Sequence, residues 1–148
     1  MPLITVNLPE NAFSAEQKQD FAKRATDTLL SLEGMQNNHL AENLSWVQFQ
    51  TFKQEDFYLA GHPVDKPHYR IEVRVFQGTM TAAIKEKLTA QLTDLVLNTE
   101  ATDHNLLNAA RVWIMIEEVP DGNWGGAGKI YRIKDLMQMM QHEKKSNI

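Results

Sequence analysis

The sequence predicts an α+β fold in which two β-α-β units form one four-stranded mixed sheet with two helices on one face. The first observation is an internal repeat: residues 2–61 and 69–128 pair at an offset of 67, with 13 identities in 60 positions and no gap. The second is that each copy opens with alternating apolar residues, the pattern of a half-buried strand. The third is a long amphipathic segment after each strand, as a crossover helix between parallel strands requires.

The first copy begins with a strand and a capped helix. Ile4, Val6 and Leu8 alternate with polar residues, which predicts a strand. Ser14 and Gln17 have the spacing of a capping box, in which each side chain satisfies a free backbone N–H at the helix start. The expected helix has one apolar face and ends near a glycine. Its apolar positions and its predicted stop are Phe21, Ala22, Ala25, Leu29, Leu32 and Gly34.

A second strand completes the first copy and leads to the joint between the copies. The segment Leu44–Phe52 is rich in aromatic and β-branched residues, which favours a strand. Phe57–Leu59 is expected to add a short hairpin arm before Gly61. The segment His62–Pro67 then connects the two copies.

The second copy has the same order of elements. Alternation over Ile71–Val75 predicts a strand, and helical spacing predicts a helix over Thr81–Asn98. Asp103–Ala110 is expected to be a loop. The apolar run Val112–Ile116 is then the last strand of the sheet.

Residues 129–148 form a C-terminal tail beyond the repeat. Ile133, Leu136, Met137 and Met140 have helical spacing, which predicts a short amphipathic helix. The charged segment Glu143–Lys145 is expected to be frayed, as chain ends commonly are. The domain expectation is therefore one domain over residues 1–148.

Composition excludes several classes of function. Lys and Arg number 15 against 19 Asp and Glu, so the net charge of -4 gives no field for attracting nucleic acid. The absence of cysteine excludes disulfides, thiol catalysis and thiolate metal sites. The five histidines are scattered, so we expect no metal site. No apolar run approaches the roughly 20 residues of a membrane span, so we expect no membrane contact and a cytoplasmic location.

The predicted sheet leaves one face without helices. Trp46, Trp113 and Met115 lie on the predicted strands, and large apolar side chains are costly to leave in water. The alternative is that some of them pack beneath the helices. We therefore expect a homo-oligomer.

Pro2 is the residue with the most informative chemistry. It follows Met1 directly, and removal of Met1 leaves proline at the chain terminus with a free secondary amine. An α-amino group has a pKa of about 7.7 to 8.0, which an apolar pocket lowers. A neutral amine can act as a general base or as a nucleophile towards a carbonyl. In the second copy Tyr69 stands at this position inside the chain, so one catalytic site per subunit is expected.

Three segments together resemble the tautomerase superfamily, whose members include 4-oxalocrotonate tautomerase, macrophage migration inhibitory factor and cis-3-chloroacrylic acid dehalogenase. They are Met1–Val6, Ser14–Lys18 and Glu118–Gly128. The resemblance covers residues 2 to about 132 and is closest to the double-length members. It implies a β-α-β-β-α-β subunit, a homotrimer, catalysis by the amino-terminal proline without metal or cofactor, and a small keto or enol acid as substrate.

Carried over residue by residue, the resemblance is partial. Pro2 matches the catalytic proline, and Trp124 matches an aromatic residue beside it that would lower the pKa of the amine. The positions of the family's substrate-binding arginines hold Phe13 and Trp46, or Met80 and Trp113 in the second copy. The positions of the dehalogenase's catalytic side chains hold Leu29, Phe76–Met80, Met115 and Gly126. Because that hydration machinery is missing, keto-enol proton transfer is the preferred reaction.

A cation is still needed to hold an acidic substrate or to stabilise an enolate oxygen. Arg70 and Arg74 share a strand face with Thr5 and Asn7 if the first strands of the two copies pair. Lys129 follows the glycine-rich turn where the dehalogenase has an arginine. The alternatives are a solvated surface position for Lys129 and an inter-subunit ion pair of Arg74 with Glu72.

The favoured hypothesis is a trimeric, cofactor-independent keto-enol tautomerase acting on a small 2-keto acid or enol. Its base is Pro2, its substrate-binding residues are Trp124, Lys129, Arg74 and Arg70, and it uses no metal. One alternative is a proline-dependent hydratase, dehalogenase or decarboxylase of small unsaturated or 3-keto acids. Another is a non-catalytic binding protein of the same fold, which an amine pKa of roughly 9 or above would favour.

Overall fold

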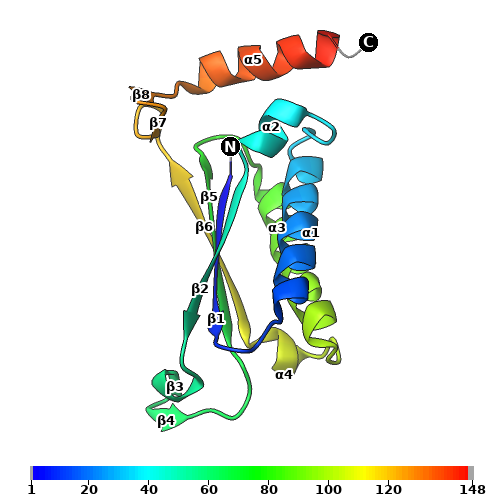
Figure 1. Ribbon diagram of the computed structural model, residues 1–148, viewed down its shortest axis with the longest axis vertical. Coiled ribbons are helices and arrows are strands. Elements are labelled where there is room, and N and C mark those ends of the chain that lie inside the picture. The colour runs from blue at the N-terminus through cyan, green and yellow to red at the C-terminus, as the bar shows by residue number, and fades with distance from the viewer. Residues whose placement is uncertain (1, 147–148) are drawn as a thin grey trace.

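The fold is a four-stranded mixed sheet with two long helices packed on one face, as the sequence predicts (Figure 1). The computed structural model describes residues 2–146. The strands of the sheet, in the spatial order β2-β1-β5-β6, are Trp46–Phe52, Leu3–Pro9, Tyr69–Phe76 and Val112–Val119. The two covering helices are α1, Ala15–Leu32, and α3, Ala82–Glu100.

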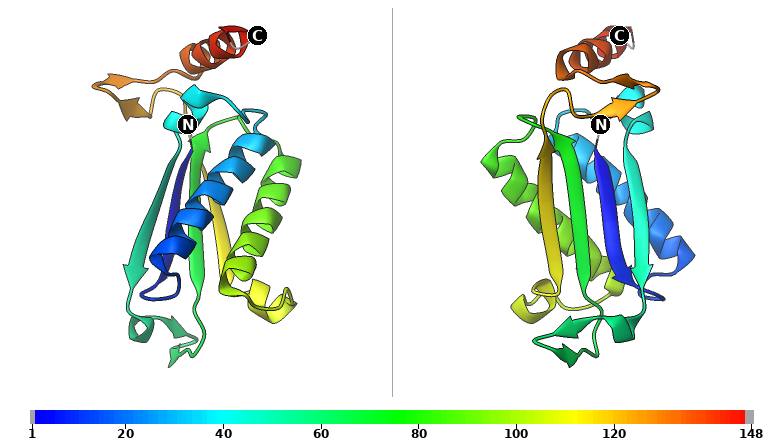
Figure 2. Two further views of the ribbon diagram at one scale, coloured as in Figure 1. Left: turned by 45° about the vertical axis from the view of Figure 1, so that its right-hand side comes forward. Right: turned by 90° about the vertical axis from the view of Figure 1, so that its left-hand side faces the viewer.

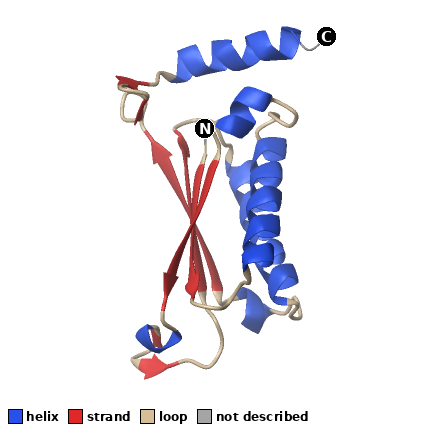
Figure 3. Cartoon of the chain, in the orientation of Figure 1, coloured by secondary structure: helices blue, strands red, loops and turns tan. Residues whose placement is uncertain are grey.

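The smaller elements lie at the two ends of the sheet (Figure 3). They comprise three further helices, one 3-10 turn and two short hairpins. The helices are α2, His39–Asn43, α4, Leu106–Ala109, and α5, Ile133–Ser146. The 3-10 turn is Gln54–Asp56, and the hairpin strands are β3, Tyr58–Leu59, with β4, His62–Pro63, and β7, Gly125–Gly126, with β8, Lys129–Ile130.

The strand pairing explains why β1 and β5 are central. Within each copy the two strands are parallel, β1 with β2 and β5 with β6, because a long helix connects them. Between the copies β1 and β5 are antiparallel, with Leu3 opposite Arg74 and Asn7 opposite Arg70. The two copies are therefore related by a reversal of direction, and their equivalent ends lie at opposite ends of the sheet.

The same local structures recur in the two copies at the offset of 67. Ser14 caps α1 with both bonds of the predicted capping box, and Thr81 caps α3 by accepting a hydrogen bond from the N–H of Ile84. Both short hairpins turn through an Ala-Gly pair with positive φ, at Ala60–Gly61 and Ala127–Gly128. Glycine adopts this conformation without strain, which explains why the pair recurs.

The hydrophobic core lies between the sheet and the helices α1 and α3. Alternate side chains of β1 and β5 point into it and are fully buried, and the inner faces of the helices meet them. The largest fully buried side chains are Phe21, Ile4, Leu8, Leu29, Ile71, Leu88, Leu92 and Leu97.

The structure corrects several predicted boundaries. The loop predicted at Asp103–Ala110 contains α4, and the strand predicted from Leu44 starts at Trp46 because Leu44 ends α2. Asn38 and Asn105 cap these two short helices. Helices of five and four residues are too short to give a periodic pattern, so the sequence does not reveal them.

Two further segments are longer than predicted. The last strand continues past Ile116 to Val119, because its parallel pairing with β5 runs on until Phe76 lies opposite Val119. The segment Glu143–Lys145, expected to be frayed, is part of α5. The Glu143 carboxylate accepts hydrogen bonds from the N–H of Leu40 at 2.9 and 3.2 Å, which link this part of α5 to α2.

The other face of the sheet carries no helix (Figure 2). Trp46 and Trp113 are each 68% exposed there, and Met115 is 47% exposed, so they do not pack beneath the helices. The charged side chains of β5 pair on the surface, with Arg70 bonded to Glu72 at 3.1 Å.

Candidate active site

A small cavity lies at the end of the sheet where β1 begins, and it encloses about 50 Å³. Space of this size holds a few water molecules or part of a small ligand. Its lining is mostly apolar and comes from the end of α1, from α2, from the end of β5 and from α5. The lining residues are Leu30, Glu33, Met35, Ala41, Phe76, Thr79, Ile133, Leu136, Met137 and Met140.

Pro2 is buried at this end of the sheet. Its carbonyl accepts a hydrogen bond from the N–H of Trp46 at 3.0 Å, which fixes the start of β1 against β2. On the other side, the antiparallel register brings the start of β1 next to Phe76 at the end of β5. Figure 1 shows this end of β1 beside α2 and beneath α5. Met1, whose removal would free the Pro2 amine, lies outside the described residues.

Glu33 is the ionisable side chain that lines the cavity. It is the residue that ends α1, and its N–H donates to the carbonyls of Leu29 and Ser31. Burial raises the pKa of the Glu33 carboxyl, while a hydrogen bond with Thr79 opposes that rise.

Trp124 lies one ring away from the cavity. It is half-buried, and its indole packs on the Phe76 ring with the two centroids 4.8 Å apart. Phe76 in turn lines the cavity. Trp124 therefore packs against Phe76 without lining the cavity itself.

The three predicted cations do not line the cavity. Arg74 lies on the open face of the sheet, where its Nε donates to the Glu117 carboxylate at 2.6 Å. Arg70 lies on the same face. Lys129 is exposed in the β7–β8 hairpin. Among the described lining residues the polar groups are Glu33 and Thr79, so the cavity of a single chain presents an acid rather than a cation.

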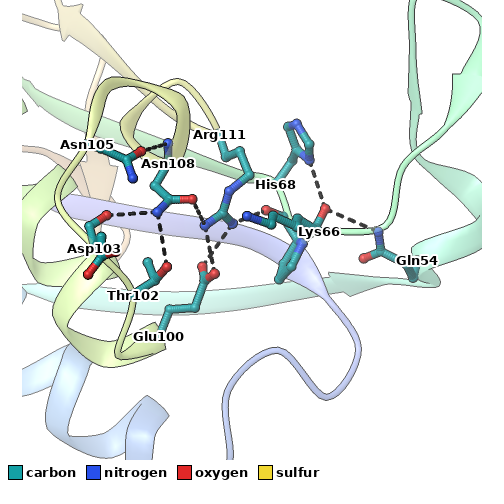
Figure 4. A network of polar contacts seen from close by, with 10 residues as sticks. Gln54, Lys66, His68, Glu100, Thr102, Asp103, Asn105, Asn108 and Arg111 are labelled. Atoms are coloured by element: carbon teal, nitrogen blue, oxygen red, sulfur yellow. Dashed lines mark hydrogen bonds and ion pairs between the residues drawn. The ribbon is translucent and has the colours of Figure 1, made fainter.

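The equivalent end of the second copy is closed by polar contacts (Figure 4). Arg111 donates to both carboxylate oxygens of Glu100, at 2.7 and 2.9 Å, and to the carbonyl of Pro67 at 2.6 Å. Tyr69, at the position of Pro2, is buried, and this burial together with Glu100 raises the pKa of its phenol. This end holds a packed ion pair where the first copy has a cavity.

Sequence reasoning about sites missed Glu33, although the repeat contains a signal for it. Glu33 and Glu100 are identical at the offset of 67, but the partner of Glu100, Arg111, is matched by Leu44. The two copies therefore share the glutamate but not the arginine that pairs with it, so their chemistry differs at this position. Only the structure shows that this acid lines a cavity.

Residues 2–146 show neither a cluster of metal ligands nor a membrane-spanning helix. No group of three or more histidine, aspartate or glutamate side chains there is arranged to hold a metal ion. Within the same residues, no helix combines the length and apolar character that crossing a bilayer demands.

Comparison with known proteins gives a family model and similar solved structures. The model described as "Putative oxalocrotonate tautomerase enzyme" matches residues 1–128. The crystal structure of Pt0534 inactivated by 2-oxo-3-pentynoate has a TM-score of 0.72 and 21% identity, covering 90% of this chain and 98% of that one. No curated protein sequence matches the chain.

Two other solved structures share the fold at similar identity. N1, a member of the cis-3-chloroacrylic acid dehalogenase family, has a TM-score of 0.69 and 20% identity, covering 97% of this chain and 99% of that one. The symmetric trimer of the fused 4-OT Q0 has a TM-score of 0.70 and 19% identity, covering 86% of this chain and 94% of its own.

Proposed function

The chain belongs to the tautomerase superfamily, and from that membership we propose that it is a keto-enol tautomerase of a small 2-keto acid or enol. Pro2, freed of Met1, takes a proton from the carbon next to a carbonyl and returns a proton elsewhere on the conjugated system. The observation that carries the proposal is a buried Pro2 at the end of the sheet that holds an apolar cavity.

The surroundings of Pro2 support its role as a base. Apolar surroundings disfavour the protonated form of an amine, so burial favours the neutral form that accepts a proton. Phe76 and Trp124 supply an aromatic wall on one side. Proton transfer by a positioned group of this kind contributes about 10² to 10⁴ in rate.

The residues proposed to bind substrate are Trp124, Lys129, Arg74 and Arg70. Trp124 excludes water from the wall, and Lys129 or Arg74 stabilises the enolate oxygen. Arg74 is bonded to Glu117 in the single chain, so it must exchange that partner to take a substrate anion.

A homotrimer is part of the same proposal. The exposed Trp46 and Trp113 support it, because a sheet face with two such side chains is costly to leave in water. The likeness to the fused 4-OT trimers supports the same stoichiometry.

The first test of the proposed function uses Pro2→Ala. The wild-type protein is expected to catalyse phenylenolpyruvate ketonisation, which is followed by absorbance. The variant is expected to lose this activity, because alanine has a primary amine without the ring that holds the proline nitrogen in place. A variant that folds as the wild type does and keeps its activity would contradict the proposal.

Intact-mass measurement is the necessary companion to that assay. The proposed base exists only after Met1 is removed, so the native protein is expected to have the mass of residues 2–148. A protein that retains Met1 has an amide nitrogen at Pro2 and cannot use it as a base.

A further inference from the structure

Glu33 is the one charged side chain among the described residues that line the cavity at the end of α1. The other walls are nearly all apolar, and a carboxylate is costly in such a place without a cation beside it. Thr79 is the other polar neighbour. Its hydroxyl donates to the carbonyl of Phe76 at 2.8 Å, and its oxygen keeps lone pairs that can accept from a cation. The cavity therefore offers an acid and a hydroxyl acceptor to a positively charged group.

The second copy shows which partner the equivalent acid has (Figure 4). Glu100 accepts two hydrogen bonds from the guanidinium of Arg111, at 2.7 and 2.9 Å. The side-chain oxygen of Asn108 accepts another from Arg111 at 3.2 Å. In the second copy, a cation of the same chain therefore compensates the charge of the glutamate.

The first copy has the acid without that cation. At the offset of 67, Leu44 stands in place of Arg111 and Ala41 in place of Asn108. Leu44 packs against apolar side chains of the same end, and Ala41, which is smaller than an asparagine, lines the cavity. The first copy thus has open space and an uncompensated acid at the end where the second copy has an ion pair.

The end of helix α1 also favours a positive charge. Glu33 directly follows the last residue of this 18-residue helix, and no basic residue lies in its last turn. The carboxyl end of a helix carries a partial negative charge that stabilises nearby cations. Burial raises the pKa of the Glu33 carboxyl. A cation bound beside it replaces the proton, which leaves to solvent, because a nearby positive charge favours the carboxylate.

We propose that this cavity binds a small primary alkylammonium ion, with the ammonium group at Glu33 and Thr79 and the alkyl chain among the apolar walls. An ammonium has three donors, whereas a guanidinium has five and needs the further carbonyl and amide oxygens that Arg111 finds in the second copy. The space of about 50 Å³ suits a ligand of about five non-hydrogen atoms. The site goes beyond the proposed tautomerase function, since its ligand is a cation and the proposed substrate is an acid.

The test measures binding of n-butylamine, which is protonated at about pH 8 as a lysine amine is. The ligands compared with it are n-butanol, which is neutral, and butyrate, which is an anion of similar size. Binding is followed by NMR of methionine methyl groups labelled with ¹³C. Met35, Met137 and Met140 line the cavity, and Met115, exposed on the open face of the sheet, is the internal control.

The wild-type protein is expected to bind the butylammonium ion with a Kd of about 1 mM, as suits so small a ligand. The methyl signals of the three cavity methionines are expected to shift, and that of Met115 is not. The affinity for n-butanol is expected to be at least about tenfold lower, because it cannot make a charged hydrogen bond to the acid. Butyrate is expected to bind more weakly still, because it carries the same charge as Glu33.

Glu33→Gln tests the acid itself. It is expected to lower the affinity for butylammonium by about tenfold or more and to leave the affinity for n-butanol unchanged. Unchanged n-butanol binding shows that the cavity of the variant is intact. Glu86→Gln, which removes an exposed carboxyl on α3, is the matched control and is expected to change neither affinity.

Leu44→Arg tests the comparison between the copies. It places an arginine 11 residues after Glu33, the spacing at which Arg111 pairs with Glu100. The new guanidinium is expected to pair with Glu33 and to abolish binding of butylammonium.

Three results would overturn the proposal. The first is an equal affinity of the wild type for butylammonium and n-butanol. The second is a Glu33→Gln variant that binds butylammonium as tightly as the wild type, and the third is a shift at Met115 with none at the cavity methionines. Every readout is binding rather than activity, so failure of the tautomerase proposal in the Pro2→Ala assay is distinguishable from failure of this one.

Discussion

At the residue scale, the equivalent glutamates of the two copies, Glu33 and Glu100, have different surroundings. Glu100 is held by Arg111, whose side chain is 6% exposed, in an ion pair that also binds the carbonyl of Pro67. Glu33 has Leu44 in place of that arginine and faces a cavity instead. The first arrangement fixes the chain just before β5, whereas the second leaves the acid on the wall of a cavity.

The ion pair between Arg111 and Glu100 predicts that a single variant loses more stability than the double variant. Arg111→Leu leaves the Glu100 carboxylate buried without a partner, and we expect it to lower the free energy of unfolding by about 3 to 5 kcal/mol. Adding Glu100→Gln removes the unpaired charge and is expected to recover most of that loss. Urea unfolding measures both, and a double variant no more stable than Arg111→Leu would contradict the account.

The raised pKa of Glu33 predicts a stability that depends on pH. The folded protein holds the Glu33 proton more tightly than the unfolded chain, whose carboxyl titrates near 4.5. The free energy of unfolding contributed by this group therefore falls as pH rises from there towards the folded pKa. Glu33→Gln removes the fall, so its stability relative to the wild type is expected to be greater at about pH 7 than at about pH 4.

Urea unfolding at the two pH values checks this prediction, with Glu86→Gln as the control that carries an exposed carboxyl. An equal stability difference between Glu33→Gln and the wild type at both pH values would show that the folded pKa is not raised.

At the element scale, α5 covers the cavity although it lies outside the repeat. Leu136 and Met140 are 3% and 5% exposed, and the side chain of Asn38 donates to the carbonyl of Met140 at 3.1 Å. The amphipathic spacing of this helix is predicted from the sequence. Its docking on α2 is not, because that contact joins residues more than 100 positions apart.

Two adjacent methionines test the docking of α5. Met140→Ala removes a buried side chain and is expected to cost about 2 kcal/mol, at the lower end for a large-to-small change, because the site borders a cavity. Met139→Ala, at a position 50% exposed, is expected to cost less than about 0.5 kcal/mol.

Hydrogen exchange of the α5 amides measures directly whether each variant loosens the docking of α5. Faster exchange confined to Met140→Ala is the expected result. Equal exchange in the two variants would show that α5 does not dock on the cavity through this face.

The elements also show what local sequence determines. The capping box of Ser14 and Gln17 and the strand β1 are predicted from local signals, and both are confirmed. The half-burial expected of β1 is not, because Thr5 and Asn7 are buried as well. The short helices α2 and α4 are set by Asn38 and Asn105 over a single turn, too short for a periodic signal. The cavity depends on four segments distant in the chain, so the repeat predicts the sheet but not the cavity that Glu33 lines.

At the scale of the whole molecule, the open face of the sheet is the feature that a single chain leaves unexplained. Trp46 and Trp113 occupy equivalent positions in the two copies and are equally exposed. An interface that repeats the same residue on two strands suits a symmetric assembly, in which each subunit presents both.

A charge on this face tests the proposed trimer. Sedimentation of the wild type is expected to give about three times the chain mass of 16.9 kDa. Trp113→Lys is expected to shift it towards the monomer, whereas Leu106→Lys, at an 84% exposed position on α4, is expected to leave it unchanged. A monomeric wild-type protein would contradict the proposal.

The central claim is that a free, reactive amine at Pro2 carries the chemistry. A secondary amine adds to the alkyne of 2-oxo-3-pentynoate by forming an N–C bond and passing its proton to the neighbouring carbon. The direct measurement is mass spectrometry of the amino-terminal peptide after treatment with this compound. The account predicts one adduct on Pro2 and loss of phenylenolpyruvate ketonisation in parallel; full modification elsewhere, with Pro2 unlabelled and activity lost, would contradict it.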